Sequence, residues 1–494
     1  MSFPSKNEST SAAQSISRSL QRRLNLRESS ARTTSALEIA AFNLVDASPM
    51  FPRGTPARIN SLTASLWPLV SLSIMSALKG RPTFNYRNQI ALALILLFAA
   101  ITRFANLGRP NELVFDEVYY VDGARDFLTY RVESQSGEAE FVVHPPLGKW
   151  LIAIGIQIFG DNPFGWRFSA ALFGLASVAL IYFITQSLFK SNFLSLAATA
   201  LISLDGLHLV MSRTALLDIF LSFFILLTFY LVIKEKYWQA GIALGLALAT
   251  KWSALYLLIA LILFLLIYKR TYIKTSIQFI VLPVSTYLIT WSGWIISDIG
   301  WKRDSASNSL LSLFNYHREI LNFHTNLKTD HPYEASPWNW LILGRPTSFF
   351  YATPKQCGQE SCSQEVLALG TPTLWWLGLF SIFITLGYFI YRRELNAGLI
   401  LLFLFANYLP WIAFPERTTF YFYSIAFEPY LILALINVMS KALENQELRG
   451  VRKKYSLVTI GLIGLTFAYF LPLYVGSVLP YQDWYGRMWF PSWI

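Results

Sequence analysis

From about residue 88 to its C-terminus, the chain consists of long apolar segments separated by polar stretches. Each apolar residue of an α-helix advances the chain by about 1.5 Å, so about 20 of them cross a hydrocarbon core roughly 30 Å thick. The segments are continuous and do not alternate in polarity, which favours membrane helices over a membrane β-barrel. Eleven spans are predicted, at 88–107, 166–189, 193–211, 215–233, 238–251, 252–268, 275–297, 374–391, 396–414, 420–440 and 455–478.

The boundary between the segments 238–251 and 252–268 decides the topology of everything that follows. Each segment is short, and Lys251 and Trp252 lie at their junction. A single long helix would place Lys251 in the middle of the membrane, where a charge is costly, and would invert the downstream spans. We therefore expect two spans joined by a tight turn on the outer side.

Residues 1–87 differ from the rest of the chain. Residues 1–58 are rich in Ser, Ala and Arg with weak periodicity, which predicts disorder, and 61–78 form only a marginal span. A transit peptide would also be Arg- and Ser-rich, but this segment carries several acids. The preferred hypothesis is that translation starts at Met75 and the upstream part is over-annotated, which an intact-mass measurement of the native protein would decide.

Composition and charge support a membrane protein and exclude a nucleic-acid-binding one. The chain is 54% hydrophobic and 14% charged, whereas soluble domains carry about 25% charged residues. The net charge is +11, and Lys and Arg cluster in the short gaps that follow residues 189, 233, 268, 391 and 440. Basic short loops are cytoplasmic, so the long loops 108–165 and 298–373 and the C-terminal tail are expected outside.

This topology predicts three parts after the N-terminal extension. Residues 88–297 form a catalytic core that includes the loop 108–165, residues 298–373 form the second outer loop, and residues 374–494 form a four-helix region with an outer tail. Pro145 and Pro146 are predicted to begin a helix of about 13 residues that is too short to span and so lies in the interface or re-enters the membrane. Asn162 and Pro163 are expected to end it.

The adjacent acids Asp116 and Glu117 follow the first span and are the main catalytic candidates. Their alternative is a solvated loop pair, since carboxylates that enter lipid are expensive. On the outer face ATP and nucleotide sugars are not reliably available, so glycosyl transfer there needs a lipid-carried donor. Such a reaction requires one carboxylate to deprotonate an acceptor hydroxyl and cations to hold the departing phosphate.

Cations at the outer ends of spans are the candidate phosphate ligands. Lys251 and Arg417 oppose the positive-inside trend, while Arg167 opens the second span, where snorkelling to the interface is the alternative role. His144 and Lys149 flank the start of the short helix, and a helix N-terminus attracts anions.

Acidic residues inside the predicted spans form a second set of candidates. Asp218 lies about one turn inside the fourth span and either serves the site or pairs with Arg213. Both Asp218 and Arg213 are candidates for binding the donor and its phosphate. Asp205 and His208 share one helix face at positions i and i+3, and Glu428 remains without an assigned role.

Metal and cysteine chemistry contribute little to the predicted site. Asp116, Glu117 and Asp218 could together hold a divalent cation, but no D-x-D spacing supports this, so no metal or other cofactor is assigned. Cys357 and Cys362 lack neighbouring His and make a poor zinc site. If their loop is extracytoplasmic, a small-loop disulfide is expected.

Seven segments, in order, resemble the protein O-mannosyltransferase family, and the match runs from about residue 88 to the C-terminus, some four fifths of the chain. They are FDEVYY (115–120), VHPPLGK (143–149), GWRFSAALFG (165–174), DGLHLVMSRTALLDIF (205–220), ATKWSALY (249–256), HPYEASPWNWLILGRPTSFFY (331–351) and PERTTFYFY (415–423). The resemblance implies an α-helical membrane protein of the GT-C glycosyltransferase fold that uses polyprenyl- or dolichyl-phosphate mannose. The loop 298–373 is too short for the lumenal β-trefoil of the eukaryotic enzymes, which implies the compact bacterial form in a plasma membrane, with the site facing the periplasm or exterior.

The resemblance also implies roles for individual residues. Asp116, with Glu117 beside it, would act as general base on a Ser or Thr hydroxyl in a single inverting displacement. The departing polyprenyl phosphate would be held by Arg167, Arg417 and Lys251. The segments at 143–149 and 331–334 would shape the acceptor groove, the latter through His331, Tyr333 and Glu334.

Two other functions compete with this hypothesis. Another GT-C transferase could move a different lipid-linked sugar to lipid A, a glycolipid or a polysaccharide, and it would share these acids and cations. A transporter would show inverted repeats and broken helices in matching halves, and the chain shows neither. The sequence does not identify the acceptor proteins, the polyprenol length or the oligomeric state.

Overall fold

Helices form most of the chain in a computed structural model that describes residues 86–134, 143–269, 272–355 and 357–494. The expectations for residues 1–85, including the start at Met75, lie outside the described residues. From the amino end the helices are α3 (Tyr86–Phe104), α4 (Glu117–Tyr130), α5 (Leu147–Phe159), α6 (Pro163–Phe189), α7 (Asn192–Ser203), α8 (Gly206–Met211), α9 (Asp218–Ile233), α10 (Tyr237–Leu248) and α11 (Ala254–Lys269).

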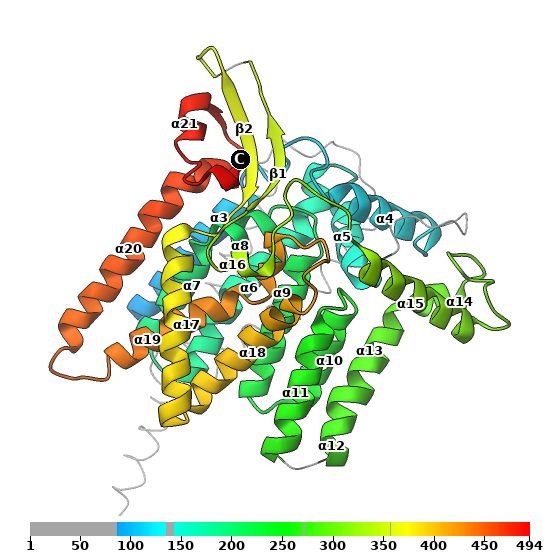
Figure 1. Cartoon of the computed structure of the whole chain (residues 1–494), viewed down its shortest axis with the longest axis horizontal. Helices are drawn as coiled ribbons and strands as arrows, with labels where there is room; N and C mark the ends of the chain where they lie inside the picture. Colours follow the sequence, from blue (N-terminus) through cyan, green and yellow to red (C-terminus); the bar gives the residue numbers. More distant parts are fainter. Residues whose placement is uncertain (1–85, 135–142, 270–271, 356) are drawn as a thin grey trace, which may run out of the picture. The chain divides into compact units, whose positions relative to one another are not determined.

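The remaining helices complete the membrane region and the two ends of the second long loop (Figure 1). They are α12 (Tyr272–Ser276), the π-helical η1 (Ile277–Val281), α13 (Leu282–Thr290), α14 (Ser292–Ile296), α15 (Ser309–Asn326), α16 (Pro337–Trp340), α17 (Pro372–Arg392), α18 (Leu395–Ile412), the 3₁₀ helix η2 (Tyr421–Ala426), α19 (Glu428–Ala442), α20 (Arg449–Tyr474), α21 (Tyr481–Tyr485) and the 3₁₀ helix η3 (Pro491–Trp493).

The prediction of a multi-pass helical membrane protein is confirmed, whereas the count of eleven spans is not. Within the described residues, six helical runs are long and apolar enough to cross a bilayer: α3, α6, the run from α12 to α13, α17, α18 and α20. Every predicted segment contains a helix, but several of these helices have fewer than 18 residues. The uncertain junction at Lys251 is a turn between α10 and α11, as expected.

The junction between α5 and α6 differs from the prediction. The short helix α5 is present, but it ends at Phe159, before Gly160 in the left-handed region at φ 87°. Asn162 instead begins the next helix, because its side-chain oxygen accepts hydrogen bonds from the N–H groups of Phe164 and Gly165, both at 3.1 Å. Pro163 then occupies the first turn of α6, where no N–H is needed.

A three-stranded antiparallel sheet is the feature that an all-helical prediction did not include. β1 (Thr347–Ala352) and β2 (Cys362–Ala368) form a hairpin, and β3 (Val478–Pro480) from the C-terminal tail pairs with β2. The expected disulfide between Cys357 and Cys362 is present in the connection of this hairpin. The sheet therefore joins the second long loop to the tail.

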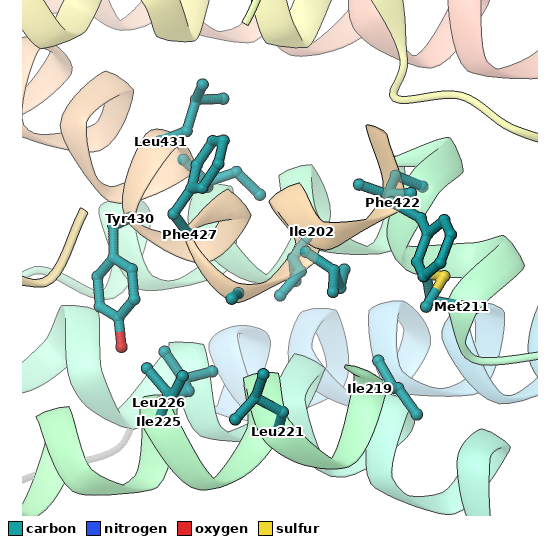
Figure 2. Close-up of a cluster of buried hydrophobic side chains, with 14 of the residues drawn as sticks. Ile202, Met211, Ile219, Leu221, Ile225, Leu226, Phe422, Phe427, Tyr430 and Leu431 are labelled. Atoms are coloured by element: carbon teal, nitrogen blue, oxygen red, sulfur yellow. The ribbon is translucent and has the colours of Figure 1, made fainter. Parts of the chain in front are cut away.

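The core of the molecule surrounds α9. This helix is apolar on every side and almost fully buried, as expected for a helix enclosed by other helices. In Figure 2, Leu221, Ile225 and Leu226 of α9 lie opposite Phe427 and Tyr430, from the segment that begins α19. Because α9 begins at Asp218, this packing fixes the position of that acid.

The two long loops and the tail meet at one end of the helices. Figure 1 shows α4, α5, α15 and the β1–β2 hairpin in its upper half, while α10, α11 and α13 extend below. Hydrogen bonds connect the loops: the N–H of Trp301 donates to the Glu133 carboxylate at 3.2 Å, and the N–H of Ala335 donates to the Thr419 carbonyl at 2.8 Å. The candidate residues of both loops are thereby gathered at this end.

Candidate active site

Asp116 stands at the N-terminus of α4, directly after a residue with a strained backbone. Phe115 has φ 49°, in the left-handed region that bulky side chains rarely adopt. Its ring is held by the rings of Phe349 at 5.0 Å, Phe422 at 5.6 Å and His331 at 5.9 Å. These contacts, from three distant parts of the chain, keep the turn in its conformation and so orient Asp116.

The Asp116 carboxylate keeps a free acceptor capacity at this end of the molecule. It is partly exposed, and no hydrogen bond to its oxygens exists within the described residues. Desolvation raises the pKa of Asp116 to about 6; the positive charge of Lys251 opposes this shift and the negative charge of Asp218 adds to it. A carboxylate with this pKa is ionised near neutrality and can still accept a proton.

Glu117 points the other way and is fully buried in an ion pair. Its two oxygens accept hydrogen bonds from Nε and Nη2 of Arg167, each at 2.8 Å, in the bidentate arrangement. They also accept from the N–H groups of Val114 at 2.9 Å and Ala215 at 2.7 Å. The structure therefore contradicts a catalytic role for Glu117, since its oxygens are occupied and excluded from solvent.

The predicted phosphate role of Arg167 is contradicted for the same reason. Besides binding Glu117, its guanidinium donates to the backbone carbonyls of Leu107, Pro110 and Glu112 at 3.3, 2.8 and 2.8 Å. The side chain is completely buried, so no donor remains to meet a ligand. Arg167 instead folds the loop after α3 onto α6.

Arg213 likewise binds the backbone and not a phosphate. Its guanidinium donates to the carbonyls of Thr102, Arg103, Ala105 and Asn106 at 2.8–3.1 Å. These are carbonyls of the last turn of α3 and the residues after it, which have no intrahelical partner. The predicted binding of phosphate by Arg213 is therefore wrong. The alternative prediction, an ion pair between Arg213 and Asp218, is also wrong.

The partner of Asp218 is Lys251. The Lys251 ammonium donates to both oxygens of Asp218, at 2.9 and 3.0 Å, and lies 4.9 Å from the centre of the Tyr423 ring. Both charges are nearly buried, and each influences Asp116 electrostatically. The structure thus brings two predicted residues, Lys251 and Asp218, close to the candidate base Asp116.

Arg417 forms no ion pair with a carboxylate among the described residues. It is half-buried and lies over the Trp411 ring at 5.3 Å, while Nε donates to the His324 carbonyl at 3.2 Å. Its Nη2 lies 3.3 Å from Nδ1 of His324, which must accept the bond because a guanidinium can only donate. Arg417 is therefore the strongest candidate for binding an anion.

His324 is a site residue that the sequence did not reveal. Its Nε2 donates to the Val143 carbonyl at 2.9 Å, and its ring lies 5.3 Å from that of His144. Burial and the adjacent Arg417 lower the pKa of His324 to about 4, so the ring is neutral at physiological pH. Nothing in the spacing of the long polar loop distinguishes this histidine from its neighbours.

Lys149 and the acceptor residues lie to either side of this cluster. Lys149 is buried between α5 and α4, close enough to Gly123 that a Cβ there would be 2.7 Å from its Nζ. His331 packs on Phe420 at 4.9 Å as well as on Phe115, while Tyr333 lies 5.4 Å from the Arg345 guanidinium and Glu334 is exposed. The acceptor role of His331, Tyr333 and Glu334 stays a prediction.

Asp205 and His208 form a separate buried cluster. Asp205 caps α8 through the N–H of His208 at 2.9 Å and accepts from the Trp375 indole at 2.8 Å. His208 accepts a bond from Arg103 at 2.9 Å, and Glu428 lies buried near the same arginine. Among the residues that the structure describes, no group of three His, Cys, Asp or Glu side chains is arranged to hold a metal ion.

Two family models match this chain over most of its length. One, described as dolichyl-phosphate-mannose-protein mannosyltransferase, matches residues 93–296, and one for the C-terminal four-helix region of protein O-mannosyltransferases matches residues 310–493. The chain belongs to the protein O-mannosyltransferase family. The matched regions contain Asp116, Lys251 and Arg417.

Named members of the family are similar to this mannosyltransferase along most of the chain. A polyprenol-phosphate-mannose–protein mannosyltransferase of Mycobacterium tuberculosis is 30% identical, with 83% of this chain and 93% of the relative covered. The protein of the same name from Corynebacterium glutamicum is 32% identical, with coverages of 81% and 92%.

Solved structures confirm the GT-C fold of this family member. The yeast Pmt1–Pmt2 O-mannosyltransferase complex bound to its sugar donor superposes with a TM-score of 0.69 at 15% identity, over 84% of this chain and 93% of that one. ArnT from Cupriavidus metallidurans superposes with a TM-score of 0.52 at 15% identity, over 80% of this chain and 77% of the other.

Proposed function

We propose that this mannosyltransferase moves mannose from a polyprenyl-phosphate donor to Ser or Thr hydroxyls of proteins at the extracytoplasmic face of a bacterial plasma membrane. The observation that carries the proposal is Asp116: a half-buried carboxylate with a raised pKa and no hydrogen-bond partner in the described chain, close to the Lys251–Asp218 ion pair. The named relatives support the substrate pair, and the basic short loops support the orientation.

The proposed reaction is one displacement at the anomeric carbon. The acceptor oxygen attacks C1 of mannose as its proton passes to the Asp116 carboxylate, and the bond from C1 to the phosphate oxygen breaks. The electron pair leaves with the polyprenyl phosphate, which gains charge as the bond breaks. A cation at that oxygen stabilises the transition state, and no general acid is required.

Arg417 is proposed as the main ligand of that phosphate, in place of Arg167. Its guanidinium is half-exposed and has no carboxylate partner among the described residues, whereas Lys251 is already neutralised by Asp218. Trp411 and the His324 carbonyl hold the guanidinium in place. The roles of Lys251 and Asp218 are then to set the charge around Asp116.

Arg417→Ala should raise the KM for the lipid donor by at least about tenfold, because a charge-assisted bond to phosphate contributes about 1.5–3 kcal/mol. Arg417→Lys should recover part of the loss, since it restores the charge but not the planar fork. Steady-state kinetics at varied donor and fixed acceptor peptide measure this. A KM change confined to the peptide would assign Arg417 to the acceptor side.

The rival function is transfer of a lipid-linked sugar to an acceptor other than protein, and the fold alone does not separate the two. Membranes containing this chain should transfer labelled mannose from polyprenyl-phosphate mannose to a Ser/Thr-rich peptide. Membranes carrying Asp116→Asn are the matched control. Label that enters only lipid or polysaccharide would refute the protein-acceptor proposal in favour of the rival.

A further inference from the structure

Helix α15 in the second long loop has one face that packs against the protein. Asn308 caps the helix by accepting a hydrogen bond from the N–H of Leu311 at 3.0 Å. On the inner face Leu313, Tyr316 and Ile320 are buried, and the Tyr316 ring lies 4.9 Å from the Trp291 ring at the end of α13. These contacts fix the orientation of α15.

A neighbouring face of α15 is an exposed apolar stripe, which we define as Leu310, Phe314 and Leu321. These side chains are 67, 66 and 52% exposed, and their spacing of four and seven residues places them on one side of a helix. Arg318 is exposed on the same side, and the structure gives it no ion pair with any described residue. Nothing in the described chain covers this stripe.

Exposed apolar side chains also lie on the helices that precede α15. Helix α13 completes one of the candidate membrane spans, and Val284 and Ile289 on it are exposed, as side chains that face lipid are. Ile296, at the end of α14, is 80% exposed. Figure 1 shows α15 running across the end of α13, where the Tyr316 ring packs on Trp291, so a helix with exposed apolar side chains lies at the end of a candidate span.

We propose that α15 lies in the interface of the bilayer, with the stripe inserted at the boundary between headgroups and acyl chains and Arg318 on anionic lipid phosphates. A helix with an apolar face and an exposed cation binds such a surface. A bilayer is favoured over a second protein copy because α15 packs on the end of a candidate membrane span, where the surface of a membrane would lie. Glu319, the acid next to Arg318, is directed to Lys302 at 3.5 Å and does not neutralise it.

The placement has a consequence that rests on the proposed function. The inner side of α15 carries His324, whose carbonyl and ring hold Arg417. A helix anchored at headgroup depth would keep this cation at the depth where the phosphate of a polyprenyl donor lies. The lipid contact would thereby position the donor site.

Spin labels at the stripe test the placement without reference to activity. Both cysteines of the chain are joined in the disulfide, so a single introduced cysteine is the one free thiol. The full chain would carry Leu310→Cys, Phe314→Cys or Leu321→Cys, with Asn326→Cys, exposed at the helix end, as the matched control. Each variant would be placed in nanodiscs of phosphatidylcholine with and without phosphatidylglycerol.

Labels at the three stripe positions should collide more often with oxygen than with a water-soluble nickel chelate, and the control label should show the reverse. Adding phosphatidylglycerol should strengthen this difference, and Arg318→Gln should abolish the gain. Nickel accessibility at all three positions would overturn the proposal. So would labels immobilised and shielded from both reagents, which would indicate a protein partner.

The coupling to the donor site has its own measurement. Phe314→Glu combined with Leu321→Glu should raise the donor KM several-fold while turnover at saturating donor is kept. Asn322→Glu, an added charge at an exposed polar position of the same helix, should leave the KM unchanged. An unchanged KM in the double variant overturns the coupling, while absence of mannosyl transfer in the unmodified chain counts against the proposed function alone.

Discussion

Asp116→Asn should lower the turnover number by about 10²–10⁴-fold, the usual contribution of a general base, while donor affinity stays within about twofold. The amide fills the same space but cannot accept the proton of the acceptor hydroxyl. Asp122→Asn is the matched control, because Asp122 is an exposed acid of the same helix that pairs with Arg125. Near-normal turnover in Asp116→Asn would show that another group is the base.

The pH dependence of the unmodified enzyme provides a second test of Asp116 as the general base. Since the pKa of Asp116 is raised to about 6, the carboxylate is ionised above that pH and protonated below it. The value of kcat/KM for the acceptor should therefore fall as the pH is lowered through about 6. The Asp122→Asn variant should show the same fall of kcat/KM at low pH. The residual activity of Asp116→Asn should not show this fall.

Arg167→Ala should destabilise the folded protein by about 3–5 kcal/mol, because it leaves the Glu117 carboxylate buried without its counter-ion. This replaces the donor-binding defect that the sequence predicts for Arg167. Thermal unfolding in detergent or nanodiscs measures the loss. Arg167→Lys should also be destabilising, since an ammonium cannot reach Glu117 and three carbonyls at once.

The matched control for this variant is Arg125→Ala. Arg125 forms ion pairs with Asp122 and Asp161 near the surface, and such pairs contribute at most about 1 kcal/mol. A folded Arg167→Ala protein of normal stability with a selective loss of donor affinity would contradict the structural role and restore the role in phosphate binding.

The sequence predicts the helices well because each apolar segment is a strong local signal. It does not predict the β1–β2–β3 sheet, whose strands are short, lie in polar loops and are completed by residues more than 100 positions away. It also misplaces Asn162, since one Asn-Pro pair can end one helix or begin the next. Here the next helix uses it.

The sequence predicted most of the charged residues near the site but not which of them form ion pairs with one another. Asp116, Lys251 and Asp218 do converge, yet Glu117 and Arg167 are partners across 50 positions and satisfy each other. A sequence gives the sign of each charge but not its counter-ion, so an arginine that folds a loop and one that can bind phosphate look alike. His324 was missed because its role depends entirely on where α15 packs.

The conformation of Phe115 suggests a route to inhibition. A left-handed backbone at such a residue costs about 1–3 kcal/mol, which the surrounding rings must offset. A drug-like compound that displaced Phe115 from among those rings would let the backbone of the turn relax. The Asp116 carboxylate would then move away from the position in which it can accept the proton of the acceptor hydroxyl. Such a compound would inhibit the enzyme although it resembles neither the sugar donor nor the acceptor peptide.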